Sequence, residues 1–165
     1  MEKIKWGIIG PGNIANNFAD GLKGSYSGQL VSIASKSEDR RKNFGDKYDI
    51  HPDFRFDSYE DIINSEHIDA IYISTPHTLH AQWTIKAAGK GKHILCEKPG
   101  AINFNEGKKI IDAVREAGVF YMEGFMYRCH PQIPKLVDII KNKIIGYVIS
   151  VETSFGFDMG KTIHK

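Results

Sequence analysis

The chain has 165 residues, of which 41% are hydrophobic and 25% are charged, so its composition is that of a globular protein and excludes a disordered or collagen-like chain. Lysine and arginine together number 22 against 20 aspartate and glutamate residues, which is too balanced to predict nucleic acid or an anionic membrane as the main partner. The apolar runs are too short to span a bilayer, and two cysteines without Cys-x-x-Cys spacing are typical of a soluble protein of the reducing cytoplasm.

Short apolar runs alternate with amphipathic segments along most of the chain, which is the pattern of strands and helices in turn. The runs that predict strands are Ile4–Ile9, 30–34, 70–74, His93–Cys96 and 119–122. Helices are expected to include Ile14 to Leu22, to run from about Glu38 to Tyr48, to include Leu79 to Ala87 and to follow Asn105, with shorter elements around 55–56 and 59–63. Asn105 is expected to cap its helix, and Gly118 is expected to end it in a left-handed conformation. This alternation predicts a parallel sheet with helices on both faces.

The pattern changes from Ile149 onward, where apolar residues such as Val151 and Phe157 alternate with small or polar ones. Such alternation is typical of a strand in an antiparallel sheet with one exposed face. A single strand of this kind cannot bury its apolar face alone. We therefore expect an α/β fold with a Rossmann-type doubly wound parallel sheet in residues 1–122. Residues 123–165 are expected to hold a connecting helix and the first strand of an incomplete second α/β domain with an antiparallel sheet.

The segment Gly10-Pro11-Gly12-Asn13-Ile14-Ala15 lies between the first predicted strand and the first predicted helix. Gly10 permits a tight turn, Gly12 lets the backbone approach a pyrophosphate, and Ala15 is small enough for close packing of helix and strand. The helix N-terminus offers free amide groups and a positive dipole to phosphates. In this context the motif predicts a dinucleotide site, and a plain glycine turn is the alternative.

The end of the second predicted strand indicates which dinucleotide would bind. NAD enzymes usually carry an acidic residue about 20 residues after the glycines, where it binds the ribose 2′-hydroxyl. Here Ser35-Lys36-Ser37 occupies that place, and the first acid is Glu38. A hydroxyl, an ammonium and the nearby Arg40 guanidinium suit a 2′-phosphate instead, so we predict NADP as the cofactor, with NAD as the alternative. The other interpretation is an exposed helix start with ordinary capping serines.

Two further segments follow strands at the same expected edge of the sheet. In Ser74-Thr75-Pro76-His77-Thr78-Leu79-His80, the two histidines lack a third ligand, so we predict no metal site. In Cys96-Glu97-Lys98-Pro99, Glu97 can accept hydrogen bonds from ribose hydroxyls. Lys98 suits a general acid and base, or an electrostatic guide for a substrate oxygen. A surface ion pair is the alternative for Lys98.

Together these segments resemble the glucose–fructose oxidoreductase and inositol dehydrogenase family (Gfo/Idh/MocA), and the resemblance covers nearly the whole chain. Within the family the chain looks most like the NADP-dependent dihydrodiol and xylose dehydrogenase branch. His77 stands where the family often has asparagine. The motifs that carry the resemblance are the Gly10 to Ala15 turn, Thr75-Pro76 with His80, Gly91-Lys92-His93-Ile94-Leu95-Cys96-Glu97-Lys98-Pro99, and Glu123-Gly124-Phe125-Met126-Tyr127-Arg128-Cys129-His130-Pro131.

The resemblance implies an NADP-dependent oxidoreductase that transfers hydride between the nicotinamide and a carbinol carbon of a sugar, polyol or diol. It also implies a longer chain, whose second domain would form a homo-oligomer through its sheet. A non-catalytic nucleotide-binding module without a substrate domain is the alternative function. Carried over by position, the implied contacts are Gly10, Gly12, Asn13 and Ile14 at the pyrophosphate; Ser35, Lys36 and Arg40 near the 2′-phosphate; Thr75, Pro76 and His80 along the cofactor groove; Glu97 at the nicotinamide ribose; Arg128 near the nicotinamide; and Lys98 as the catalytic lysine.

Overall fold

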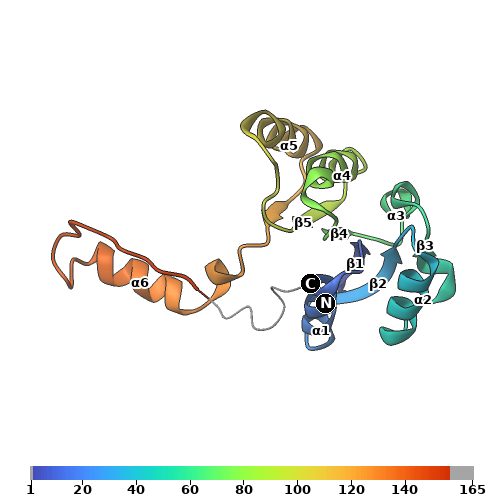
Figure 1. Cartoon of the computed structure of the whole chain (residues 1–165), viewed down its shortest axis with the longest axis horizontal. Helices are drawn as coiled ribbons and strands as arrows, with labels where there is room; N and C mark the ends of the chain where they lie inside the picture. The colour runs from blue at the N-terminus through green and yellow to red at the C-terminus, as the bar shows by residue number, and fades with distance from the viewer. Residues whose placement is uncertain (1, 157–165) are drawn as a thin grey trace, which may run out of the picture. The chain divides into compact units, whose positions relative to one another are not determined.

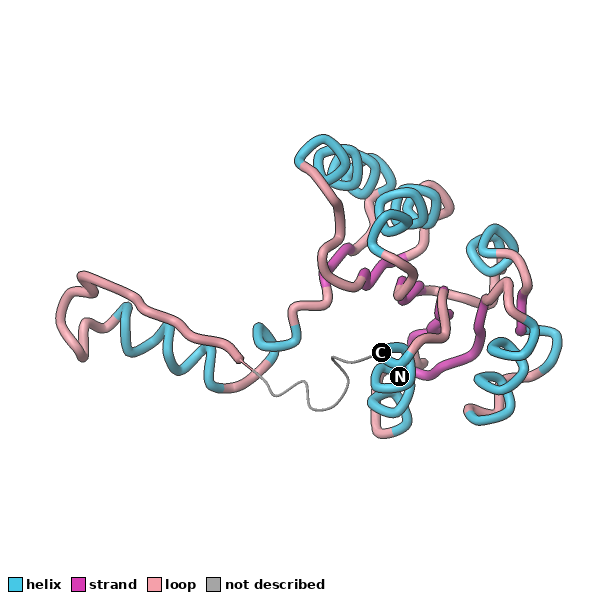
Figure 2. The backbone as a smooth tube through the Cα atoms, viewed as in Figure 1, coloured by secondary structure: helices cyan, strands magenta, loops and turns pink. Residues whose placement is uncertain are grey.

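The structure is a computed structural model that describes residues 2–156 (Figures 1 and 2). Contacts divide the chain into two compact units, of which the first ends at Phe125 and the second begins at Met126. No helix within residues 2–156 is long and apolar enough to cross a lipid bilayer.

The first unit is built on a six-stranded parallel sheet with the strand order β3-β2-β1-β4-β5-β6. The order reverses between β1 and β4, as in a doubly wound Rossmann sheet, so the predicted fold of this part of the chain is confirmed. The strands are β1 (Ile4–Ile9), β2 (Gly28–Ala34), β3 (Arg55–Phe56), β4 (Ala70–Ile73), β5 (His93–Cys96) and β6 (Tyr121–Glu123).

Helices cover both faces of this sheet. Figure 1 shows α1 and α2 on one face and α3, α4 and α5 on the other. The helices are α1 (Asn13–Lys23), α2 (Glu38–Lys47), α3 (Tyr59–Asn64), α4 (His80–Ala88) and α5 (Phe104–Ala117), with short 3-10 helices η1 (Pro52–Phe54) and η2 (His77–Leu79).

Each face of the sheet has its own hydrophobic core, because successive side chains of a strand point to opposite faces. Ile8 packs with Ala15 and Ala19 of α1, whereas its neighbour Ile9 packs on the side of α3 and α4. In β4, Tyr72 belongs to the first core, and the residues on either side of it belong to the second. The interior strands are therefore buried on both faces, as their continuous apolar runs indicate.

The start of α5 differs from the prediction that Asn105 caps it. The helix begins at Phe104, and the side chain of Asn103 accepts a hydrogen bond from the backbone N–H of Glu106 at 3.0 Å. The Glu106 carboxylate in turn accepts from the N–H of Ile102 at 3.3 Å, which ties the residue before the cap to the first turn of the helix. At the other end Gly118 adopts φ = 65°, which confirms the predicted left-handed cap.

Between residues 126 and 156, the second unit contains a 3-10 helix, η3 (Met126–Cys129), and one α-helix, α6 (Gln132–Lys141). The strand expected from Ile149 is not formed in residues 149–156, which have no regular secondary structure; Phe157 lies outside the described residues. A strand needs a neighbour to complete its hydrogen-bond ladder, and the described part of the second unit contains no strand. The assignment of residues 123–165 to a second domain stays a prediction.

Two glycines of α5 should respond to alanine with opposite signs. Gly118→Ala forces a Cβ into φ = 65° and should lower the free energy of unfolding by about 1–2 kcal/mol. Gly107→Ala adds a methyl group that meets only Ala101 at 3.9 Å and should raise it by about 0.5–1 kcal/mol, because alanine restricts the unfolded chain. Urea denaturation of the two variants measures both effects. Equal signs would contradict the helix end described here.

Candidate functional site

The loops that follow five of the strands open at one edge of the sheet, because the strands are parallel. Each of these loops carries at least one residue of interest. They begin at Gly10, Ser35, Ser74, Glu97 and Gly124. Ligands of open α/β sheets bind at this carboxyl edge, at the point where the strand order reverses. Here that point lies between β1 and β4, beside Gly10 and Ser74.

The turn after β1 is held against the loop after β4. Gly10 adopts φ = 91°, and a Cβ placed there would lie 3.0 Å from the Ser74 carbonyl oxygen. The Ser74 hydroxyl donates a hydrogen bond to the Gly10 carbonyl oxygen at 2.7 Å, and the Gly12 N–H donates to the same oxygen at 2.8 Å. No side chain other than hydrogen fits at Gly10 without a shift of the backbone.

The N-terminus of α1 is open. Gly12 occupies the N-cap position, so no side chain accepts hydrogen bonds from the first amides, and the first turn contains no acidic residue. A Cβ at Gly12 would meet no atom within 4 Å, which means that the space beside it is available to a ligand. Asn13 and Ile14 are exposed next to this space, and Ile14 is 40% exposed.

The loop after β2 contains two kinds of side chain: serines that hydrogen-bond within the loop, and cations that are exposed. Ser35 is 4% exposed, and its hydroxyl accepts a hydrogen bond from the Ser37 N–H, so this side chain is engaged within the loop. Ser37 caps α2, as the alternative interpretation of these serines proposed. Lys36 and Arg40 are exposed. The Lys36 ammonium lies 5.9 Å from the centre of the Tyr59 ring.

Arg41 is a residue of this loop that the sequence analysis missed. Its guanidinium donates a hydrogen bond to the Ser35 carbonyl oxygen at 2.7 Å, which places a third cation at the end of β2. The search about 20 residues after the glycines ended at Arg40. Only the position of Arg41 in the first turns of α2 could have suggested that its side chain also lies at the end of β2. The cluster of Lys36, Arg40 and Arg41 can balance a dianionic group.

The loop after β4 is tied to the loop after β5 through His80. The His80 side chain is fully buried, with Nε2 2.8 Å from the Thr75 carbonyl oxygen and Nδ1 2.8 Å from the Pro99 carbonyl oxygen. The ring can therefore affect a cofactor groove only through the two loops that it joins, and the predicted direct contact does not fit this geometry. Pro76 is exposed. The hydroxyl of Thr75 is buried and has no hydrogen-bond partner within residues 2–156.

The loop after β5 presents Glu97 and Lys98. Glu97 is half-buried, and its Oε1 accepts a hydrogen bond from the hydroxyl of Tyr72 at 2.6 Å. Burial, and then the hydrogen bond to this carboxylate, raise the pKa of Tyr72 far above its ordinary value, so the phenol stays a donor. Burial likewise raises the pKa of the Cys96 thiol to about 12, which makes this cysteine unreactive at neutral pH.

Lys98 is exposed at the carboxyl edge and makes no ion pair or hydrogen bond with another residue in the part of the chain that the structure describes. The surface ion pair that was the alternative for this lysine is therefore absent among residues 2–156. The ammonium is available to a ligand. The peptide bond between Lys98 and Pro99 is cis.

Arg128 lies in η3 of the second unit and is exposed, so its predicted place near the nicotinamide stays a prediction. Within the described residues, no group of three or more histidine, cysteine or acidic side chains is placed to hold a metal ion.

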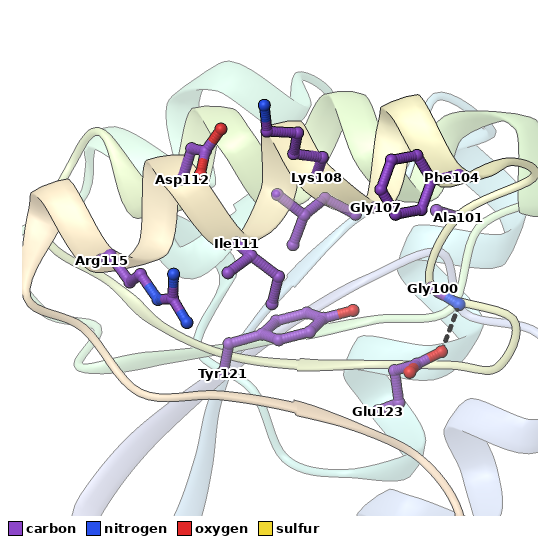
Figure 3. A pocket seen from close by; sticks show the side chains of 11 residues that line it. Gly100, Ala101, Phe104, Gly107, Lys108, Ile111, Asp112, Arg115, Tyr121 and Glu123 are labelled. Carbon is purple, nitrogen blue, oxygen red and sulfur yellow. Dashed lines mark hydrogen bonds between the residues drawn. The ribbon is translucent and has the colours of Figure 1, made fainter.

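A cavity of about 550 Å³ opens between α5 and β6, and the sequence analysis did not anticipate it. Figure 3 shows Ile111 and Arg115 of α5 pointing toward Tyr121, whereas Lys108 and Asp112 point away from it. Near its other end the backbone N–H of Gly100 donates a hydrogen bond to Glu123 at 2.7 Å. None of the predicted cofactor contacts lines this cavity, although Gly100 follows Lys98 by two residues.

Comparison with known proteins gives relatives along nearly the whole chain. A D-xylose 1-dehydrogenase (NADP(+)) from Haloferax volcanii is 34% identical over 93% of this chain and 46% of its own length. A trans-1,2-dihydrobenzene-1,2-diol dehydrogenase from Xenopus tropicalis is 33% identical over 95% of this chain and 48% of its own. The chain thus spans about half the length of these relatives.

Solved structures show the same fold. A variant of KijD10, a 3-ketoreductase from Actinomadura kijaniata solved with TDP-benzene and NADP, superposes with a TM-score of 0.80 at 31% identity, over 89% of this chain and 45% of that one. Residues 4–125 match a family described as an oxidoreductase family with an NAD-binding Rossmann fold. That range coincides with the first unit of the structure almost residue for residue, and the chain therefore belongs to the Gfo/Idh/MocA oxidoreductase family.

Proposed function

We propose that this chain is the cofactor-binding half of an NADP-dependent oxidoreductase that acts on a carbinol carbon of a sugar, polyol or diol. The observation that carries the proposal is the convergence of an uncapped α1, the Glu97 carboxylate and an unpaired Lys98 at the carboxyl edge of one sheet. The named activities of the xylose and dihydrodiol dehydrogenase relatives support the substrate class.

The residues at the switch point fit a dinucleotide. The space beside Gly12 and the free amides of the first turn of α1 would receive the pyrophosphate, with the helix dipole favouring its negative charge. The buried hydroxyl of Thr75, which has no partner among residues 2–156, would gain one from the cofactor. Lys36, Arg40 and Arg41 would balance the 2′-phosphate. We include Arg41 because its guanidinium is already oriented by the Ser35 carbonyl.

Glu97 and Lys98 would act at the nicotinamide end. Glu97 would accept a hydrogen bond from a ribose hydroxyl, and Lys98 would contact the substrate oxygen. When bound, the cofactor would supply the redox chemistry, as NADPH for hydride donation and as NADP+ for hydride acceptance. During oxidation of the alcohol, a neutral Lys98 amine would take the hydroxyl proton, and during reduction the ammonium would return it. The fold thus orients cofactor and proton donor relative to each other before substrate binds.

A non-catalytic nucleotide-binding module remains the second candidate. The chain spans about half of its relatives, and apolar side chains such as Ile149 and Val151 are 97% and 75% exposed. Turnover of a panel of sugars and diols with NADPH or NADP discriminates the two functions. Turnover by this chain alone would exclude the module.

We further propose that the whole protein works in the cytoplasm and forms a homo-oligomer through the sheet of its second domain. The two cysteines support a reducing compartment, since Cys96 and Cys129 are both unpaired. Exposed apolar residues of the second unit support association.

NADPH should bind this chain more tightly than NADH, as measured by calorimetry. Combined Lys36→Ala and Arg40→Ala substitutions should weaken NADPH binding by about tenfold or more and leave NADH binding unchanged, because only the 2′-phosphate needs these charges. Lys90→Ala, at an exposed position after α4, is the control. Equal affinities of the parent chain for the two cofactors would exclude the NADP preference.

Alanine at the two glycines of the turn should separate stability from binding. Gly10→Ala should lower the free energy of unfolding by about 1–3 kcal/mol, because its positive φ and the Ser74 backbone leave no room. Gly12→Ala should leave stability nearly unchanged but weaken NADPH binding, because its methyl group would occupy the space assigned to the pyrophosphate. Denaturation and calorimetry of both variants test the pair. Unaltered binding by Gly12→Ala would place the phosphates elsewhere.

Lys98→Met in the complete protein should lower kcat at least about 100-fold while NADPH affinity stays unchanged, because the methionine side chain is of similar length but has no group that can take or give a proton. Steady-state kinetics and cofactor titration check this, with Lys90→Met as the matched control. Near-full turnover would remove Lys98 from the mechanism.

A further inference from the structure

Two side chains from neighbouring strands meet on the α1 side of the sheet. The register of β4 and β5 places Tyr72 opposite Leu95, and Glu97 lies two residues beyond Leu95, so it projects from the same face. Tyr72 is 2% exposed, and its hydroxyl donates to Glu97 Oε1 at 2.6 Å. Neither the turn motif nor the Glu97 segment requires a tyrosine at this position of β4.

The Tyr72 ring is held in place by α1. The ring of Phe18 stacks on Tyr72 with centres 4.1 Å apart and planes inclined by 24°. Trp6 of β1 packs edge-on against the same Phe18 at 5.2 Å. Since Gly12 is the N-cap of α1, this stack joins the helix that follows the glycine turn to the carboxylate at the end of β5.

The Glu97 carboxylate is partly buried, and the contacts below involve its Oε1. Its Oε1 meets the Tyr72 hydroxyl, and a Cβ at Gly124 would lie 3.1 Å from this same oxygen, so the backbone after β6 closes over it. Oε2 has no hydrogen bond to any of the residues 2–156. The carboxylate therefore has one oxygen committed to the protein and one oxygen available.

We propose that Tyr72 is a positioning residue that orients Glu97 so that its Oε2 receives the ribose hydroxyl at the nicotinamide end of the cofactor. This inference rests on the proposed function. Through Phe18, Tyr72 also couples the ribose-binding carboxylate to the helix that receives the pyrophosphate. The two ends of the dinucleotide are thereby held at a fixed separation by packed aromatic rings.

The test compares two ligands on the chain as it exists. NADPH contains the nicotinamide ribose, whereas adenosine 2′,5′-bisphosphate contains only the adenosine end. The variant Tyr72→Phe removes the hydroxyl and keeps the ring that stacks on Phe18. It should bind NADPH about tenfold more weakly, because only NADPH has the ribose hydroxyl that Glu97 would contact. The affinity for the bisphosphate should be unchanged. Tyr26→Phe, at a position that is 96% exposed, is the control and should alter neither affinity.

A double-mutant cycle tests whether Tyr72 acts through Glu97. Once Glu97→Ala has removed the side chain that accepts the Tyr72 hydrogen bond, addition of Tyr72→Phe should cause no further loss of NADPH affinity. Independent losses in the two single variants, or equal weakening of both ligands by Tyr72→Phe, would overturn the positioning role and leave the proposed function standing. If the parent chain binds neither ligand, the proposed function fails, and the role of Tyr72 fails with it.

Discussion

The strand order reverses between β1 and β4, and the helices that follow these neighbours cover opposite faces of the sheet (Figure 1). Their loops consequently diverge at the carboxyl edge, at the switch point where ligands of doubly wound sheets bind. Gly10 and Ser74 lie at this point. The cation cluster after β2 and the Glu97 segment after β5 lie on either side of it, because β2 and β5 are the next strands outward. One topological constraint thus orders the whole candidate site.

Polar side chains at this edge divide into two kinds. Ser74, His80 and Glu123 hydrogen-bond to backbone groups of neighbouring loops, which satisfies groups that would otherwise be buried without partners and fixes the loops relative to one another. Lys36 and Lys98 remain exposed, and neither forms an ion pair with another of the residues 2–156. The loops are therefore shaped before a ligand arrives, and the exposed charges can respond to it.

Much of the first unit could be predicted from its sequence, because buried parallel strands are continuous apolar runs and Gly10 and Gly12 follow the first of them. The cap of α5 was misplaced, since hydrophobic periodicity marks a helix only from its first buried residue; Asn103 with Glu106 three positions later was the signal for the true start. The strand expected from Ile149 is not formed in residues 149–156 for a different reason. Alternation of apolar and polar residues predicts which side of a strand would be buried, but a strand also needs a neighbouring strand for its hydrogen bonds.

The site was less predictable than the fold. Glu97 and Lys98 could be identified because they follow a strand directly and carry charge. Tyr72 could not, because a tyrosine within an apolar run reads as a core residue, and its partner is 25 residues away. Ser35 and His80 have residue types that suit a ligand, yet their side chains are buried and bonded within the protein. Residue type predicts which side chains can bind a ligand, whereas packing determines which of them are available.

The contact between Ser74 and Gly10 makes the glycine turn a product of long-range assembly. The hydroxyl that holds the Gly10 carbonyl oxygen comes from a residue 64 positions later, and the same oxygen accepts the Gly12 N–H. During synthesis from the N-terminus, the phosphate-binding motif is made among the first residues, but it acquires this support only after β4 has emerged and paired with β1. A nascent chain that ends before β4 would contain the complete motif and lack the part that holds it in shape.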